Sequence, residues 1–268
     1  MGKFSGVLIA TDMDGTLLGR DHAVSEPTRR AIEYFTREGG LFSVSTGRSP
    51  LGFESVRPTV SYNAPCILSN GAVLYDYSLD KALYVRNVEG DYMSVLRHAF
   101  EIYPKVGIEF HMLWEKSMVN PNEQIARHLK AVGCTAKTVA RAEDVTEPFI
   151  KIIFVDHEDV VSELSAELIE KYGTGFTFVC SNPWMLEMQN TDTHKGSGVA
   201  QLARLLGVRS ENVYTAGDAG NDIAMMTAFE SFAPANATPE AKSAADHLMP
   251  DCDEHTIAAV IEFLDRRY

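Results

Sequence analysis

The 268-residue chain has few cysteines, no long apolar run and few basic side chains. Its four cysteines are far apart and form no C-x-x-C pair, so we expect reduced thiols of a cytoplasmic protein and no disulfide framework. No apolar stretch approaches the roughly 20 residues of a membrane-spanning helix. The first apolar run, Val7 to Ala10, is also too short for a secretory signal.

Basic residues are the scarcer charge: 24 Lys and Arg stand against 37 Asp and Glu, a net charge of −13. This balance argues against a nucleic-acid surface and against binding to anionic membranes. The eight histidines show no H-x-x-x-H or similar spacing, so the sequence gives no indication of a zinc site. There is no internal repeat and no Pro/Gly-rich linker, yet the length exceeds the usual ~100–150 residues of one domain. We therefore expect two domains.

The most informative segment follows the apolar run Val7 to Ala10, where Asp12 and Asp14 precede Gly15. Two carboxylates held this close repel one another, and they stay ionised only beside a cation, most simply Mg²⁺. An ordinary turn would give the same string, because Asp and Gly both favour turns. An EF-hand loop is excluded, since Gly15 follows Asp14 directly.

Two later segments add groups suited to phosphate. The β-prone run Leu41 to Ser45 leads into Thr46, whose hydroxyl can donate to a phosphate oxygen, and Gly47, which lets backbone amides approach. Lys195 opens an amphipathic run and can act as a point charge for phosphate. Taken alone, the segment with Thr46 is equally well explained as an ordinary polar loop, and Lys195 as a solvated lysine near a helix start.

A fourth polar segment follows the apolar run Val213 to Ala216. Asp218 is the natural third oxygen ligand for an ion held by Asp12 and Asp14. Asn221 and Asp222 stand at the start of the next helix, where they can also be simple caps. Doubly wound parallel sheets bind ligands at the carboxyl ends of their strands, which is the geometric reason to group Asp12, Thr46 and Asp218 in one site.

In this order, the four segments resemble the motifs of the haloacid dehalogenase (HAD) superfamily of phosphotransferases: D-x-D-G-T, S-T-G-R, K-G and G-D-x-x-N-D. The string Ser69 to Ala72 and the long insert before Lys195 are similar to the Cof-type subfamily of sugar-phosphate and related phosphatases. The resemblance implies an α/β fold, with a doubly wound parallel-sheet (Rossmann-like) core and an inserted α/β cap domain. We place the core at residues 1–81 and 190–268 and the cap, which would choose the substrate, at residues 82–189.

The resemblance also implies roles for individual residues. Asp12 would be the nucleophile that forms an aspartyl-phosphate, and Asp14 the general acid and base. Thr46 and Lys195 would hold the phosphoryl group. Mg²⁺ would bind Asp12, the backbone carbonyl of Asp14, and Asp218. The residues expected to bind substrate or phosphate are Gly15, Gly47, Arg48, Asn70, Asn221 and Asp222. Asp222 would also support Lys195 or metal-bound water. In the cap, Trp184 and Glu187 are candidates for contacting the leaving group, and Arg86, His111 and Lys151 are further candidates. For each of the five, ordinary packing or a solvated surface position is the more common role of such a residue.

The expected function is a Mg²⁺-dependent phosphatase that acts on a small phosphorylated metabolite, a sugar phosphate or related phosphoester. We expect a cytoplasmic monomer or homodimer with no nucleic-acid or membrane partner. A phosphomutase or phosphotransferase would share the same motifs, and a catalytically idle binding protein is a third reading. The chain departs from many relatives at Pro234, in a stretch that is commonly Met-Gly-Asn-Ala, which bears on substrate fit more than on chemistry.

Overall fold

The structure, a computed structural model, describes residues 2–268 apart from the side chain of residue 181. The chain forms two compact units. The core unit comprises Met1–Gly47, Val56–Tyr84 and His194–Tyr268. The inserted unit comprises Arg48–Ser55 and Val85–Thr193. Within the described residues, none of the helices is both long and apolar enough to cross a membrane.

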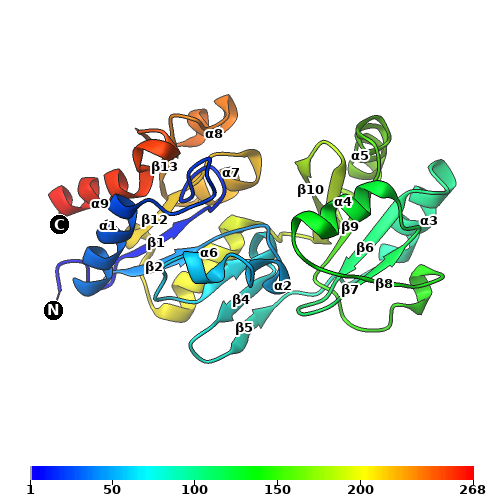
Figure 1. Cartoon of the computed structure of the whole chain (residues 1–268), viewed down its shortest axis with the longest axis horizontal. Helices are drawn as coiled ribbons and strands as arrows, with labels where there is room; N and C mark the ends of the chain where they lie inside the picture. The colour runs from blue at the N-terminus through cyan, green and yellow to red at the C-terminus, as the bar shows by residue number, and fades with distance from the viewer. Residues whose placement is uncertain (1) are drawn as a thin grey trace. The chain divides into compact units, whose positions relative to one another are not determined.

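The core unit is built on a five-stranded parallel sheet with strand order β14-β13-β12-β1-β2 (Figure 1). Its strands are β1 (Leu8–Thr11), β2 (Leu41–Val44), β12 (Val213–Ala216), β13 (Glu230–Pro234) and β14 (His247–Met249). The inner strand β1, between β12 and β2, is buried along its whole length, as expected where helices cover both faces of a parallel sheet.

Helices pack on both faces of this sheet. Those of the core unit are α1 (Glu26–Arg37), α6 (Lys195–Leu206), α7 (Ile223–Met226), α8 (Pro239–Ala244) and α9 (Thr256–Arg267). Leu8 and Ala10 of β1 face a cluster with α6, α7 and α8. Phe232 of β13 has the opposite orientation and packs edge-on against Phe263 of α9. The predicted doubly wound parallel sheet is therefore confirmed.

A three-stranded sheet, β3-β4-β5, adjoins the edge of the core sheet. Its strands are β3 (Cys66–Leu68), β4 (Val73–Asp76) and β5 (Lys81–Val85). The sequence pattern placed a strand at residues 84–88, and that placement is wrong by three residues. The chain turns back immediately after β4, at a turn that ends in the left-handed residue Asp80 (φ 49°), so the next strand begins earlier.

The inserted unit is an α/β region of its own, with a six-stranded sheet of order β10-β11-β9-β6-β7-β8. The strands are β6 (Gly107–His111), β7 (Lys116–Val119), β8 (Lys137–Thr138), β9 (Lys151–Val155), β10 (Phe176–Asn182) and β11 (Met185–Asn190). Neighbours run antiparallel except the parallel pair β7 and β8. The short strand β8 carries no apolar alternation, and the sequence did not predict it.

Helices lie on both faces of the inserted sheet. They are α3 (Tyr92–Ile102), α4 (Glu123–Ala131) and α5 (Glu158–Tyr172), and the segment before them holds the one-turn helix α2 (Pro50–Phe53). Helices α3 and α5 form the larger apolar core with one face. Helix α4 packs through Ile125 against Ile153 and Val155 on the other. This second face also carries polar side chains, which are described below.

Candidate active site

The carboxyl ends of three parallel strands of the core unit, β1, β2 and β12, lie side by side at the same end of its sheet. In the parallel register, Thr11 of β1 pairs with Ala216 of β12 and with Val44 of β2. The backbone N–H of Asp12 donates to the Ala216 carbonyl at 2.8 Å. The segments that follow these strands therefore begin at the same end of the sheet, as expected for parallel strands. They carry Asp12, Thr46 and Asp218.

A cluster of three carboxylates forms there. Asp12, Asp218 and Asp222 each offer one oxygen within 4.8 Å of the others. The buried Lys195 ammonium donates to Asp12 Oδ1 at 2.5 Å and to Asp222 Oδ1 at 2.6 Å. Lys195 is the first residue of α6, and His194 caps that helix by accepting the N–H of Ser197. The helix start thus carries the lysine to the carboxylates.

The ionisation of this cluster is strongly perturbed. Burial raises the pKa of Asp12 well above its ordinary value; Asp222 and Asp218 raise it further, and Lys195 opposes them. Burial, and then Asp222, also raise the pKa of Asp218. Burial alone would lower the pKa of Lys195, but the carboxylates of Asp12 and Asp222 outweigh it and raise that pKa. The lysine therefore stays charged.

The charge of the cluster identifies what it can bind. Three ionised carboxylates and one ammonium leave a net charge of −2, which is costly in a buried place. A donor set of carboxylate oxygens suits a hard divalent cation such as Mg²⁺. Asp12 and Asp218 would hold such an ion, because Asp222 already has another task. Its Oδ2 accepts the backbone N–H groups of Asp218 at 3.0 Å and Ala219 at 3.1 Å, while its Oδ1 binds Lys195.

Asp14 does not belong to this carboxylate cluster. Sequence reasoning grouped Asp12, Asp14 and Asp218; the structure groups the side chains of Asp12, Asp218 and Asp222. The Asp14 side chain is 43% exposed, and its Oδ1 lies 3.9 Å from Nδ1 of His22. The chain turns at Met13, the one residue between the two, whose side chain is buried while that of Asp14 is exposed. An exposed carboxyl is well placed for proton exchange, not for holding a buried ion.

Gly15 allows the close approach of Asp218. Its φ is +88°, and a Cβ there would lie 2.7 Å from Oδ2 of Asp218. Two contacts to this turn were not predicted. The Thr16 hydroxyl donates to Asp218 Oδ1 at 3.0 Å, and the Asn236 amide donates to the Gly15 carbonyl at 2.8 Å. Thr16 closes the D-x-D-G-T string, which could have identified it; the role of Asn236 depends on a contact across 221 residues.

The remaining predicted residues divide between the two units. Thr46, Gly47, Asn70 and Asn221 belong to the core unit, and the Asn221 amide donates to Asn70 Oδ1 at 3.3 Å. Arg48 belongs to the inserted unit.

Trp184 and Glu187 also lie in the inserted unit. Glu187 pairs with Lys151 at 2.9 Å, and the Trp184 ring lies beneath the Arg127 guanidinium at 5.7 Å.

The inserted unit has a polar cluster that sequence spacing did not reveal. Glu109 Oε2 lies 2.7 Å from His111 Nε2, and its Oε1 lies 2.7 Å from His128 Nδ1. His128 is on α4, so this carboxylate joins the helix to the sheet. Although two imidazoles and a carboxylate can bind zinc, the Lys116 ammonium is 3.7 Å from Glu109 and already supplies the neutralising charge.

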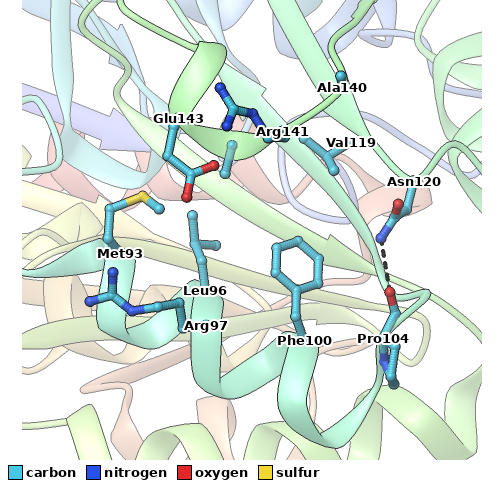
Figure 2. Close-up of a pocket in the computed structure, with 11 residues that line it drawn as sticks. Met93, Leu96, Arg97, Phe100, Pro104, Val119, Asn120, Ala140, Arg141 and Glu143 are labelled. Atoms are coloured by element: carbon cyan, nitrogen blue, oxygen red, sulfur yellow. Dashed lines mark hydrogen bonds between the residues drawn. The ribbon is translucent and has the colours of Figure 1, made fainter.

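A pocket of about 280 Å³ lies on the other face of the inserted unit (Figure 2). Leu96 and Phe100 of α3 form its floor, and Arg97, Arg141 and Glu143 carry charges at its rim. It borders the apolar core shared by α3 and α5. The pocket therefore lies on the face opposite to that of Glu109 and His128.

Comparison with known proteins shows the family of the chain. A family model described as haloacid dehalogenase-like hydrolase matches residues 9–261. The putative phosphatase YxeH of Bacillus subtilis is 27% identical over 96% of this chain and 97% of its own length. The 5-amino-6-(5-phospho-D-ribitylamino)uracil phosphatase YwtE of the same organism is 26% identical, over 96% and 97%.

Solved structures share the fold. A haloacid dehalogenase-like hydrolase from Bacteroides thetaiotaomicron superposes with a TM-score of 0.82 at 21% identity, over 96% of this chain and 99% of that one. A HAD/COF-like hydrolase from Plasmodium vivax, described as putative, gives a TM-score of 0.82 at 24% identity, over 99% and 98%.

Proposed function

This chain belongs to the haloacid dehalogenase-like hydrolase family, and on that premise we propose that it is a Mg²⁺-dependent phosphatase of a small phosphorylated metabolite. One observation carries the proposal: the Lys195 ammonium bridges Asp12 and Asp222 inside a buried cluster that also includes Asp218. Such a cluster is suited to a phosphate, whose oxygens need a cation, and to a carboxylate nucleophile, which needs its repulsion from phosphate offset.

The proposed reaction has two steps. An oxygen of Asp12 attacks phosphorus while the bond from phosphorus to the leaving oxygen breaks, and Asp14 gives that oxygen its proton. Asp14 then takes a proton from water, the water oxygen attacks phosphorus, and the bond to Asp12 breaks to release inorganic phosphate. The exposure of Asp14 supports its part, because a group that must gain and lose a proton in each cycle benefits from contact with water.

The other residues hold and orient the phosphoryl group. Lys195 neutralises charge on Asp12 and on the phosphate, and Asp222 keeps the ammonium in place. The Thr46 hydroxyl donates to a phosphate oxygen. Asp12, Asp218 and the backbone carbonyl of Asp14 would bind Mg²⁺, which supplies Lewis-acid stabilisation of the phosphoryl charge.

We propose that the inserted region, residues 82–189, acts as a lid that selects the leaving group. All four motifs lie outside it, so it serves something other than phosphoryl chemistry. A closing lid would exclude water and strengthen the electrostatics of Lys195. The substrate class we favour is a sugar phosphate or related phosphoester, in keeping with the phosphorylated ribityl compound in the name of one relative.

The test is a panel of phosphorylated sugars and a small aryl phosphate, assayed with Mg²⁺ for released inorganic phosphate. Turnover of at least one phosphoester, dependent on Asp12, is the expected result. Phosphate returned to an organic acceptor, seen as an isomerised or transferred phosphoester without free phosphate, would show a mutase or phosphotransferase instead. Absence of Mg²⁺-dependent turnover across the panel would contradict the proposal.

A further inference from the structure

The turn between β3 and β4 has an uncommon backbone. Three consecutive residues, Ser69, Asn70 and Gly71, have φ values of 50°, 51° and 97°. The left-handed region is unfavourable for residues that carry a Cβ, although asparagine tolerates it better than most. All three residues are buried. Such a conformation persists only where the surroundings determine it, and it is often found at functional sites.

Asn70 connects two of the motif segments. Its backbone N–H donates to the Thr46 carbonyl at 3.0 Å, and its side-chain Oδ1 accepts the Asn221 amide at 3.3 Å. The same side chain lies over Gly47, where a Cβ would be 3.2 Å from Oδ1. Asn70 thus contacts the segment of the phosphate-binding hydroxyl and the segment that leads into Asp222.

Gly71 brings the same turn against the third motif segment. A Cβ on Gly71 would lie 2.3 Å from the His194 carbonyl oxygen, so only glycine fits. A Cβ on Gly198 would lie 2.8 Å from the Gly71 Cα. His194 caps α6, and the next residue is Lys195. The position of the turn is therefore coupled to the helix start that carries the lysine.

We propose that Asn70 is a positioning residue, which sets the Thr46–Gly47 loop and the Asn221–Asp222 loop relative to one another and to the start of α6. It acts through these segments and does not bind the phosphate itself, which replaces the direct contact expected from sequence. The catalytic consequence rests on the proposed function; the positioning itself does not.

Two substitutions distinguish the effect of the Asn70 side chain from the effect of its left-handed backbone conformation. Asn70→Gly keeps the left-handed turn and removes the amide. Asn70→Asp keeps an Oδ1 acceptor for Asn221 and tolerates the same φ. The matched control is Asn120→Gly in the inserted unit, because Asn120 also has a positive φ (50°) and its amide donates to the Pro104 carbonyl at 3.2 Å (Figure 2).

The first readout is amide hydrogen exchange at Asp218, Ala219 and Asp222, whose N–H groups are hydrogen-bonded within the fourth motif segment. In Asn70→Gly we expect exchange there to accelerate by about tenfold or more, since local opening becomes easier. Asn70→Asp should preserve the protection, and Asn120→Gly should leave it unchanged. Equal exchange in Asn70→Gly and in wild type would overturn the proposal whether or not any phosphoester is hydrolysed.

The second readout is the division of the effect between kcat and KM for a small aryl phosphate. Misplacement of the catalytic groups should lower kcat in Asn70→Gly on the order of 100-fold and leave KM nearly unchanged. A rise in KM with kcat retained would show that Asn70 binds the phosphate directly and would refute positioning. If wild type hydrolysed no phosphoester, the proposed function would fail, and the exchange comparison would still decide the role of Asn70.

A double-mutant cycle with Asn221→Ala gives a further check. Because Asn70 and Asn221 share one hydrogen bond, the second substitution should add little to the first. Fully additive losses would mean that the two amides act separately, against the proposal.

Discussion

At the scale of single residues, opposing effects act on the pKa of Asp12. Burial and two neighbouring carboxylates raise its pKa, and the Lys195 ammonium at 2.5 Å lowers it. Added positive charge stabilises the ionised form of such a buried carboxylate. A divalent cation would therefore stabilise the site and keep Asp12 ionised as a nucleophile.

The first prediction at this scale is that Asp12→Asn abolishes turnover. An amide cannot attack phosphorus as a carboxylate does, while its similar shape and the loss of one repulsive charge should let the fold survive. Phosphate release and thermal unfolding measured on the same preparation check both parts. Substantial activity, with contamination by wild type excluded, would refute the nucleophile assignment.

The second residue prediction concerns Glu109, which joins α4 to the inserted sheet. Burial alone would raise its pKa, but the hydrogen bonds from His111 and His128 outweigh burial and hold the pKa well below 4.5. The Lys116 ammonium also faces it, at 3.7 Å. A lowered folded pKa contributes stability that is fully present above the unfolded value of about 4.5 and is lost as the pH falls through the folded pKa.

Glu109→Gln should therefore lower the free energy of unfolding by about 3 kcal/mol at neutral pH, because it leaves Lys116 buried without its counter-charge. The difference from wild type should shrink as the pH falls below about 4.5. Urea unfolding at a series of pH values measures this, with the exposed Glu115→Gln as control. A difference independent of pH would show that the lowered pKa is not what stabilises the contact.

At the scale of elements, the start of α6 combines tight packing with chemistry. Gly198 is one turn into the helix, where a Cβ would lie 2.6 Å from Cγ2 of Ile67 and 2.8 Å from the Gly71 Cα. Glycine in a helix usually costs about 1 kcal/mol relative to alanine. Here the missing Cβ lets the helix approach β3 and the strained turn closely.

We therefore expect Gly198→Ala to destabilise the protein by about 1–3 kcal/mol, the opposite of its effect in an isolated helix, because the added Cβ would clash with a buried side chain and with the Gly71 backbone. Activity should fall as well, since the displaced helix carries Lys195. Thermal unfolding and kcat are the measurements. Gly175→Ala, where the nearest atom would be 3.7 Å away, is the control and should change neither much. A stabilised Gly198→Ala would show that the helix shifts freely.

At the scale of the whole molecule, the core unit contains the groups for phosphoryl chemistry and the inserted unit contains none of the four motifs, apart from Arg48 of the second. This division predicts that metal dependence belongs to the core unit and discrimination between substrates to the inserted unit.

Chelation should accordingly reduce the rate to near the uncatalysed level, and added Mg²⁺ should restore it. Ca²⁺ should substitute poorly, because it prefers more ligands at longer distances. Mg²⁺ should also raise the unfolding temperature of wild type, and this rise should be lost in Asp218→Asn. Full activity after exhaustive chelation would contradict the metal assignment.

Substitutions in the inserted unit should alter substrate preference. We expect Trp184→Ala and Glu187→Gln to change kcat/KM among phosphorylated sugars by more than they change hydrolysis of a small aryl phosphate. The exposed Glu170→Gln serves as control. An equal loss on every substrate would assign Trp184 and Glu187 to packing, in line with the contacts of Glu187 to Lys151 and of Trp184 to Arg127.

The fold class, and the three strands whose carboxyl ends carry Asp12, Thr46 and Asp218, were predictable from the sequence. These features are local: an apolar run forms a strand, polar residues follow it, and parallel pairing aligns the strand ends whatever the rest of the chain does. The helices at residues 92–102 and 158–171 were predicted almost to their ends for the same reason, since amphipathic spacing is contained in the helix itself.

Which side chains meet depends on the tertiary structure. It placed Asp222 with Asp12 and Asp218 in the carboxylate cluster and left the Asp14 side chain exposed, because which side chains converge depends on packing that spacing along the chain does not encode. It joined Glu109 and His111 to His128 across a helix and a sheet. It set Asn70 between Thr46 and Asn221, residues 175 positions apart, and contacts at such separation are fixed only when the whole core packs.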